Sequence, residues 1–362
     1  MAKETRLEMM EPAKPATLLL QLAKNHFKSK EIDFRLLKGD GSDRKIYLIN
    51  SVSSSLDSVV GVYHDNLEEN RDFIFLTHKM KEAGIPVPEV IEIAASEKAY
   101  LIQYLGKHTL AESIEIWKKN SDEHKILLAY KNVLNYLHQI QTGLTPLLTD
   151  FLRIRKLGIT NLIADLTYFK TDFIERFSFP ELFSERVEQE LKNSLIEKLS
   201  KYTPSVFVYR DFQSRNIMWY HNSPWFIDYQ SAFFGTIHYD LASLLYASKS
   251  GLNDTAREEL LNYYHGHIRS PLSLEEFENE FYLWVLLRRL RSLGAYGFLS
   301  QVKAKPGFYD SIYPTLQELI DLISEKRALK DFTNTLDMVK QIAFKWRKIK
   351  SEDVSSQTWK GV

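Results

Sequence analysis

The sequence contains no cysteine. Disulfides, thiolate catalysis and cysteine-based zinc sites are therefore excluded. There is also no excess charge of either sign, because 47 Lys and Arg residues balance 47 Asp and Glu residues. This balance argues against a strongly basic nucleic-acid platform and leaves a small molecule as the expected partner. No stretch approaches the roughly 18 apolar residues that a membrane-spanning helix needs, and residues 1–15 lack the apolar core of a secretory signal. We therefore expect a cytoplasmic protein without membrane or nucleic-acid partners.

The composition is that of a globular protein with two lobes. Its 362 residues are 44% hydrophobic and 26% charged, which suffices for a substantial core. Residues 1–104 predict antiparallel strands with one inserted helix, after a loose arm at residues 1–15. Residues 105–330 predict helices around one short β-rich stretch, and residues 331–362 predict a final helix and tail. This order indicates an α+β fold with a small β-rich N-terminal lobe and a larger helical C-terminal lobe.

Apolar spacing places the predicted elements. The predicted strands span residues 34–38, 45–49, 59–63, 89–94, 99–104, 206–208, 217–220 and 225–227. The predicted helices span residues 18–27, 68–83, 110–117, 123–141, 161–173, 187–199, 240–248, 255–267, 275–293, 314–326 and 332–349. Residues 294–298, which contain two glycines and two aromatic residues, predict an aromatic loop.

A glycine-containing turn connects the first two predicted strands. It reads Gly39-Asp40-Gly41-Ser42-Asp43-Arg44. Glycine lets phosphate oxygens approach backbone N–H groups closely. No Gly-Lys-Ser/Thr follows, so the turn is not a P-loop. A plain hairpin turn is the simpler interpretation of this pattern on its own.

The chemistry is concentrated between Val206 and Tyr246. An apolar run ends at Asp211, Asn216 follows five residues later, and a β-rich hairpin ends at Asp228. Oxygen ligands of this kind suit Mg²⁺, which keeps water and phosphate oxygens in its shell. A carboxylate beside such a site can orient a hydroxyl group for attack on a phosphoryl group. The stretch therefore predicts a magnesium site with one further carboxylate.

Three spaced motifs in this stretch resemble one family. They read Tyr209-Arg210-Asp211-Phe212-Gln213-Ser214-Arg215-Asn216, Phe226-Ile227-Asp228-Tyr229-Gln230 and Tyr239-Asp240-Leu241-Ala242. Together with the two predicted lobes, they are similar to the protein-kinase-like fold and, within it, to the aminoglycoside phosphotransferase and choline kinase family. The nearest resemblance is to bacterial anomeric kinases of the cell-wall amino sugars N-acetylmuramate and N-acetylglucosamine. It runs from about residue 30 to residue 325.

The resemblance implies an ATP- and Mg²⁺-dependent kinase that transfers the γ-phosphoryl group to a hydroxyl of a small molecule. It implies that Asp211 orients or deprotonates this hydroxyl, and that Asn216 and Asp228 hold Mg²⁺. Asp240 and Arg210 are implied to have structural roles, with Asp240 bracing the catalytic loop. The nucleotide is implied to contact the glycine turn through Gly39, Gly41 and Ser42. It is also implied to contact the hinge between the two lobes, which Gln103, Tyr104 and Leu105 occupy.

Two positions depart from the family pattern. A typical kinase grips the α- and β-phosphates with a lysine of its third strand, but residues 59–63 read Val-Val-Gly-Val-Tyr. The amino-sugar kinases resemble this chain in lacking that lysine, so its absence favours them over the antibiotic kinases. Arg44 is our candidate for the missing positive charge, and a solvated surface arginine is the alternative. Tyr209 stands where the family has a histidine that is usually structural.

The acceptor-binding residues are less well defined. Arg288 lies where the family's C-terminal helix has an arginine, so it either contacts the acceptor or forms an internal ion pair. Asp165 matches an acidic position on the acceptor side of the family. Arg215 and Gln230 adjoin the metal residues in sequence and are further candidates.

Three functions are consistent with these motifs. The first is a kinase for the anomeric hydroxyl of an amino sugar. The second is an aminoglycoside- or choline-type phosphotransferase, which an acceptor pocket rich in carboxylates favours because those acceptors are cations. The third is a pseudokinase or regulatory nucleotide-binding protein, suggested by the missing lysine and by Tyr209.

Overall fold

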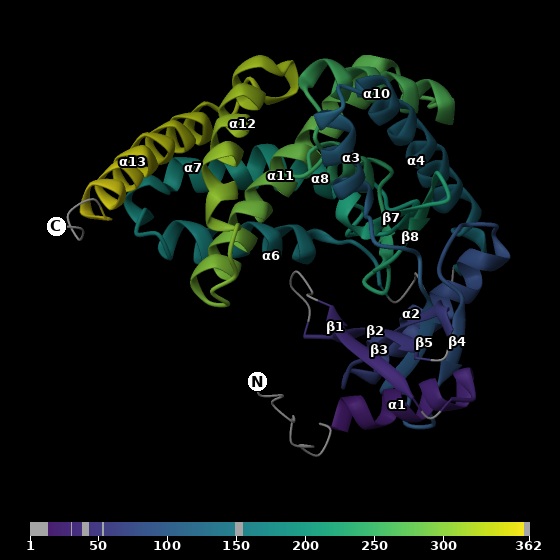
Figure 1. The fold of residues 1–362 in the computed structure, drawn as a ribbon. Helices are drawn as coiled ribbons and strands as arrows, with labels where there is room; N and C mark the ends of the chain where they lie inside the picture. The colour runs from purple at the N-terminus through teal and green to yellow at the C-terminus, as the bar shows by residue number, and fades with distance from the viewer. Residues whose placement is uncertain (1–13, 30, 38–42, 53, 149–154, 358–362) are drawn as a thin grey trace. The chain divides into compact units, whose positions relative to one another are not determined.

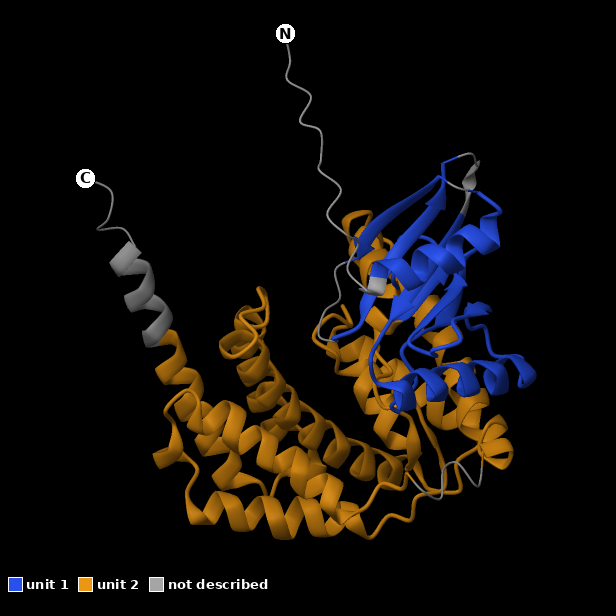
Figure 2. Ribbon diagram, turned by 90° about the horizontal axis from the view of Figure 1, so that it is seen from below, with its two compact units in different colours: residues 1–109, 217–231 blue, residues 110–216, 232–362 orange. Residues whose placement is uncertain are grey.

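A computed structural model describes residues 14–29, 31–37, 43–52, 54–148 and 155–357, and Figure 1 shows its elements. Its contacts divide the chain into two compact units (Figure 2). Unit 1 comprises residues 1–109 and 217–231, and unit 2 comprises residues 110–216 and 232–362. The sequence predicted a boundary between the lobes after residue 104. The N-terminal unit instead runs to residue 109 and also includes residues 217–231.

Unit 1 contains a five-stranded antiparallel sheet with the strand order β1-β2-β3-β5-β4. Helix α1 packs on one face of the sheet through a core that includes Leu19, Ile49 and Leu101. On the other face, Phe73 of α2 stacks on Tyr100 of β5 with 5.3 Å between the ring centroids. The elements are β1 (Ile32–Leu37), β2 (Lys45–Ser51), β3 (Ser54–Tyr63), β4 (Val90–Ile93), β5 (Ala99–Gln103), α1 (Lys14–Phe27) and α2 (Leu67–Glu82).

A hairpin from the middle of the chain completes unit 1. It consists of β7 (Ile217–Tyr220) and β8 (Ser223–Phe226). The turn residues His221 and Asn222 have φ values of 49° and 57°, as a tight two-residue hairpin turn requires. The N–H of Trp219 donates to the carbonyl of His108 at 2.9 Å, and that of Phe226 donates to the carbonyl of Pro86 at 2.9 Å. These backbone bonds join the hairpin to the N-terminal segment.

Unit 2 is mainly helical, and its longest helix is α11 (Leu274–Gln301). Strand β6 (Val206–Val208) pairs with β9 (Phe233–Gly235). The two predicted motifs around Asp211 and Asp228 lie between these strands in the sequence. The other helices are α3 (Leu110–Lys119), α4 (Glu123–Gly143), α6 (Ile159–Phe169), α7 (Glu185–Glu190), α8 (Glu197–Ser200), α9 (His238–Leu245), α10 (Asp254–Ile268), α12 (Ile312–Glu325) and α13 (Thr333–Gln357). Short 3₁₀ or π segments are η1 (Pro146–Leu148), η2 (Lys170–Glu175), η3 (Pro180–Leu182), η4 (Leu191–Ile196), η5 (Ser214–Asn216), η6 (Tyr309–Ser311) and η7 (Arg327–Leu329).

The aromatic loop predicted at residues 294–298 is wrong, because these residues continue α11. Gly294 and Gly297 do not interrupt the helix. They instead allow close packing, since a Cβ at Gly294 would lie 2.7 Å from the carbonyl oxygen of Tyr168, and one at Gly297 would lie 1.8 Å from that of Asp172. Within the described ranges, every helix is too short or too polar to span a bilayer.

Candidate active site

The catalytic loop of unit 2 is held by the buried carboxylate of Asp240. Oδ2 of Asp240 accepts the N–H of Tyr209 at 2.7 Å, and Oδ1 accepts the N–H of Arg210 at 3.0 Å. Arg210 has a φ of 81°, a left-handed conformation that costs a non-glycine residue free energy. The two hydrogen bonds to Asp240 stabilise this conformation. They thereby fix the backbone immediately before Asp211.

The charge of Asp240 is balanced by its surroundings. Asp240 is 0% exposed, and burial raises the pKa of its carboxyl to about 7. The backbone donors of Tyr209 and Arg210 and the positive charge of Arg288 lower this pKa, whereas the charge of Asp211 raises it. These contacts support the bracing role predicted for Asp240.

Asp211 and Asn216 lie on the same short loop. Nδ2 of Asn216 donates to the backbone carbonyl of Asp211 at 2.8 Å. The hydroxyl of Ser214 in η5 donates to the carbonyl of Lys249 at 3.0 Å, which anchors the loop to the segment after α9. The side chain of Asp211 is neither fully buried nor fully exposed. The hydrogen bond from Asn216 therefore closes the loop, and the carboxylate of Asp211 lies on the same loop.

Asp228 belongs to a second group of polar residues, in unit 1. Its Oδ1 lies 3.5 Å from Nη1 of Arg44 and accepts Nε2 of Gln230 at 2.9 Å. Nη2 of Arg44 lies 3.0 Å from Oε2 of Glu69 in α2, and the Arg44 side chain is only 6% exposed. Asp228 has a φ of 72°, so it too holds a strained backbone conformation. Arg44 therefore bridges two carboxylates and is not a solvated surface residue.

The sheet explains why Arg44 can stand in for a lysine of β3. Val62 of β3 pairs with Ile46 of β2 and with Tyr100 of β5, and Tyr100 packs against α2. Arg44 directly precedes β2, and its contact with Glu69 places its side chain on the α2 side of the sheet, on which Val62 also lies. In protein kinases, the lysine of the third strand pairs with a glutamate of the following helix. In this chain, Arg44 forms the corresponding ion pair with Glu69 of α2.

Two of the four predicted acceptor residues, Arg288 and Asp165, lie on α11 and α6 of unit 2, whereas Gln230 belongs to unit 1. Nη1 of Arg288 donates to the hydroxyl of Tyr239 at 2.6 Å, and Arg288 is 6% exposed. This burial favours the internal role that the sequence left open for Arg288. Asp165 of α6 accepts Nε of Arg291 at 2.7 Å. Arg215 lies in η5 and is half-buried.

Comparison with known proteins decides the family. The pattern of the phosphotransferase enzyme family matches residues 33–277. The chain belongs to this family. The phosphotransferase is 23% identical to an N-acetylmuramate/N-acetylglucosamine kinase of Neisseria meningitidis, over 69% of this chain and 79% of that protein. It is 22% identical to an enzyme of the same name from Pseudomonas aeruginosa, over 76% of this chain and 79% of that protein.

Solved structures agree with the predicted fold class. A choline kinase from Streptococcus pneumoniae aligns with a TM-score of 0.53 and 14% identity, over 83% of this chain and 98% of that one. An aminoglycoside phosphotransferase in complex with gentamicin aligns with a TM-score of 0.58 and 16% identity, over 90% and 99% of the two chains. The predicted kinase-like fold and family are therefore confirmed. The chain is a phosphotransferase that acts on a hydroxyl group.

The donor atoms of the two predicted metal ligands are of the kind that magnesium binds together with phosphates. The predicted ligands are the amide oxygen of Asn216, in unit 2, and the carboxylate of Asp228, in unit 1. No group of three or more His, Cys, Asp or Glu residues that could hold a metal occurs in the part of the chain that the structure describes. Mg²⁺ needs no such cage, because it is usually bound through one or two carboxylates with phosphates and water.

The structure describes only some of the predicted nucleotide-binding residues. Gly39, Gly41 and Ser42 lie outside the described residues. Gln103 ends β5, and its N–H donates to the carbonyl of Glu89 at 2.9 Å. Tyr104 follows half-buried, and Leu105 is 4% exposed. The contact of this segment with adenine stays a prediction.

Two residues that contact predicted site residues were not themselves predicted, namely Glu69, which binds Arg44, and Arg291, which binds Asp165. Glu69 could have been found as an acidic residue in the first turn of the helix after β3, where a kinase places the partner of its lysine. Arg291 could have been found because it lies three residues after Arg288 in the same helix and therefore on the same side. Neither carries a local motif of its own.

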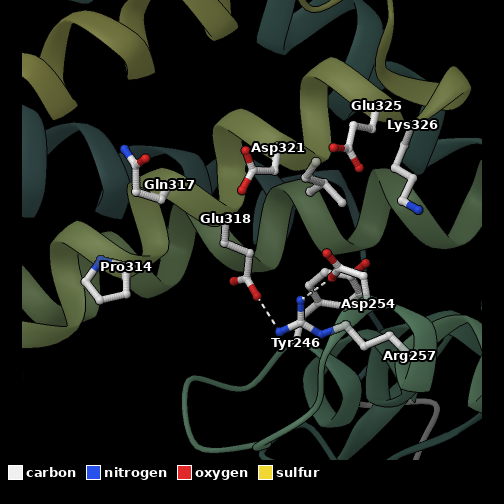
Figure 3. A pocket seen from close by; sticks show the side chains of 10 residues that line it. Tyr246, Asp254, Arg257, Pro314, Gln317, Glu318, Asp321, Glu325 and Lys326 are labelled. Carbon is white, nitrogen blue, oxygen red and sulfur yellow. Dashed lines mark hydrogen bonds and ion pairs between the residues drawn. The ribbon is translucent and has the colours of Figure 1, made fainter.

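A pocket elsewhere in unit 2 is not part of this site. Its volume is about 330 Å³, and residues of α10 and α12 line most of it (Figure 3). There Arg257 donates to Asp254 at 3.0 Å and to Glu318 at 2.5 Å. Arg257 thus binds two carboxylates of the lining, and the lining includes none of the predicted site residues.

Proposed function

We propose that this phosphotransferase uses ATP and Mg²⁺ to phosphorylate the anomeric hydroxyl of an amino sugar. The observation that carries the proposal is the buried Arg44, which joins Glu69 and Asp228. An active kinase needs a cation in this arrangement to hold the nucleotide phosphates. Its presence in this chain argues against a pseudokinase. The amino sugar is proposed from the names of the two bacterial relatives.

Each residue has a defined task in the proposed reaction. The carboxylate of Asp211 accepts the proton of the acceptor hydroxyl as the oxygen of that hydroxyl bonds to the γ-phosphorus. The bond from this phosphorus to the β,γ-bridging oxygen breaks, and ADP leaves with that electron pair. Arg44 offsets the negative charge of the phosphates, and Asp240 keeps Asp211 in position. Bound Mg²⁺, held by Asn216 and Asp228, would supply further positive charge for the phosphate oxygens.

Turnover of ATP to ADP with free sugars tests the proposal. We expect turnover with N-acetylmuramate or N-acetylglucosamine and none with the corresponding methyl glycosides, in which the anomeric oxygen is blocked. Asp211→Asn should lower the rate by about 10²- to 10⁴-fold, the range of general-base contributions. Asp331→Asn, which changes an exposed aspartate, is the matched control. Turnover with the methyl glycosides would exclude the anomeric position.

Two outcomes would replace the proposed function. Turnover with choline or an aminoglycoside, and with no sugar, would assign the chain to those kinases. Absence of Mg²⁺·ATP binding in a calorimetric titration would instead support a pseudokinase.

A further inference from the structure

One face of α11 lies against the segment that positions Asp211. Arg288 donates to the hydroxyl of Tyr239 at 2.6 Å, and its guanidinium also lies over the Tyr239 ring, 4.6 Å from the centroid. Tyr239 directly precedes Asp240, which holds the catalytic loop. Arg291 follows Arg288 by three residues, so both side chains leave the same side of the helix.

Arg291 is fixed on one side only. Its Nε donates to Oδ1 of Asp165 at 2.7 Å, and its guanidinium lies 5.9 Å from the centroid of the Tyr168 ring. Among the described residues, its Nη1 and Nη2 donate to no other group. The side chains of Arg291 and Asp165 are 24% and 21% exposed. The free edge of the guanidinium therefore has access to a ligand.

The guanidinium of Arg291 lies within range of the negative charges of Asp165 and Asp211. Burial lowers the pKa of Arg291, but the charges of Tyr239, Asp165 and Asp211 outweigh it and raise this pKa overall. The negative charges of Asp165 and Asp211 therefore lie near the guanidinium. Arg291 stays fully charged at any physiological pH.

This arrangement suits an anion better than a cation. The carboxylate of Asp165 is paired with Arg291, so the guanidinium offsets its negative charge and weakens its attraction for an ammonium group. Arg210 precedes Asp211 directly in sequence, and Arg288 and Arg291 lie on the adjoining face of α11. A guanidinium with two free nitrogens matches the two oxygens of a carboxylate.

We propose that Arg291, oriented by Asp165, binds a carboxylate of the acceptor. The preferred acceptor is therefore a sugar acid, and neither a polyamine nor a quaternary ammonium compound. The inference rests on the proposed function, because it concerns the acceptor of that reaction. Arg291 acts as a specificity-determining residue, and Asp165 acts as its positioning residue.

The test compares N-acetylmuramate, which carries a carboxylate, with the neutral N-acetylglucosamine. In Arg291→Gln, kcat/KM for N-acetylmuramate should fall by about 10- to 100-fold more than kcat/KM for N-acetylglucosamine, as expected for loss of a hydrogen bond between charged groups. Arg291→Lys keeps the charge without the forked geometry and should lose less. Asp165→Asn should shift the same ratio in the same direction, mainly through KM.

Arg327→Gln is the matched control, because Arg327 forms an exposed ion pair with Glu275 and should leave the ratio unchanged. Equal losses for the two sugars in Arg291→Gln and Arg291→Lys, or no loss in either, would overturn the inference and leave the proposed function intact. Wild-type protein that phosphorylates neither sugar would overturn the proposed function, and the acceptor assignment with it.

Discussion

At the scale of single residues, the main finding concerns the position of a buried positive charge. Arg44, directly before β2, carries a charge that a typical kinase has on a lysine of β3. β3 has no lysine, yet the α2 side of the sheet still carries a buried positive charge at Arg44. This charge reaches Glu69 and Asp228, the carboxylates of the second helix and of the hairpin. The same charge can therefore be supplied from the start of β2, because neighbouring strands lie only about 4.8 Å apart.

Removing this charge should affect nucleotide use more than folding. We expect Arg44→Gln to lower kcat/KM for ATP by about 10²- to 10³-fold, the usual effect of losing one charge-stabilising donor. The double variant Arg44→Gln/Val62→Lys should recover part of the loss, since position 62 faces the same side. Steady-state kinetics at varied ATP check both expectations. Arg35→Gln, on exposed β1, is the control, and near-wild-type kinetics for Arg44→Gln would remove Arg44 from the site.

A buried histidine beside the catalytic segment gives a prediction about pH. His238 is 1% exposed, and its Nδ1 lies 3.4 Å from Oε2 of Glu280. Burial lowers the pKa of His238 from 6.5 to about 3, and burial followed by the charge of Glu276 raises that of Glu280 from 4.5 to about 7. Between pH 4.5 and 6.5 the folded pair thus holds one proton on Glu280, and the unfolded pair holds one on His238. The two contributions to pH dependence cancel in this window.

Glu280→Gln should remove this cancellation. Below pH 6.5, His238 then takes up a proton only in the unfolded chain, so stability falls as the pH falls towards 4.5. Melting temperatures of wild type and variant, compared from pH 7.5 to pH 4.5, measure the effect. Glu115→Gln, on the exposed side of α3, is the control. Parallel curves for wild type and Glu280→Gln would contradict the raised pKa of Glu280.

At the scale of elements, helices and strands followed from apolar spacing, whereas packing between helices did not. The spacing predicted α2, α4 and α10 closely, because each has a buried side and an exposed side. In α11 nearly every residue from Phe281 to Leu290 is buried, so no amphipathic pattern marks where the helix ends. At the level of sequence, the two glycines near its end therefore favour a loop, although the structure continues the helix through them.

The glycines of α11 should be intolerant of substitution. A Cβ at Gly297 would lie 1.8 Å from a backbone oxygen of η2, whereas one at Gly266 in α10 would have no atom within 4 Å. We expect Gly297→Ala to destabilise the protein by about 3 kcal/mol or more, because backbone must move. Gly266→Ala should instead stabilise it by up to about 1 kcal/mol. Chemical denaturation of both variants makes the comparison, and equal stabilities would contradict the close packing of α11.

At the scale of the whole molecule, candidate site residues can be predicted from the sequence, whereas the long-range contacts that position them cannot. Asp211, Asn216 and Asp228 follow from short local motifs. The pairing of Arg44 with Glu69 and Asp228 does not, because it depends on contacts across 25 residues or more of chain. The discontinuity of unit 1 was missed for the same reason. Backbone bonds such as that of Phe226 to Pro86 leave no signature in side-chain periodicity.

This discontinuity predicts that the hairpin segment supports the N-terminal sheet. Tyr229 is 0% exposed, and its ring stacks on Phe73 of α2 with the centroids 5.0 Å apart. Tyr229→Ala should cost about 3–5 kcal/mol, as other large buried aromatic truncations do. The loss should appear as faster hydrogen exchange in β3 and β5, more than 100 residues away in sequence, because Phe73 also stacks on Tyr100 of β5.

Trp225→Ala, a half-buried position of the same hairpin, should change exchange mainly in β7 and β8. If Tyr229→Ala did the same and left β3 and β5 protected, the hairpin would be an appendage of the sheet and not part of its core.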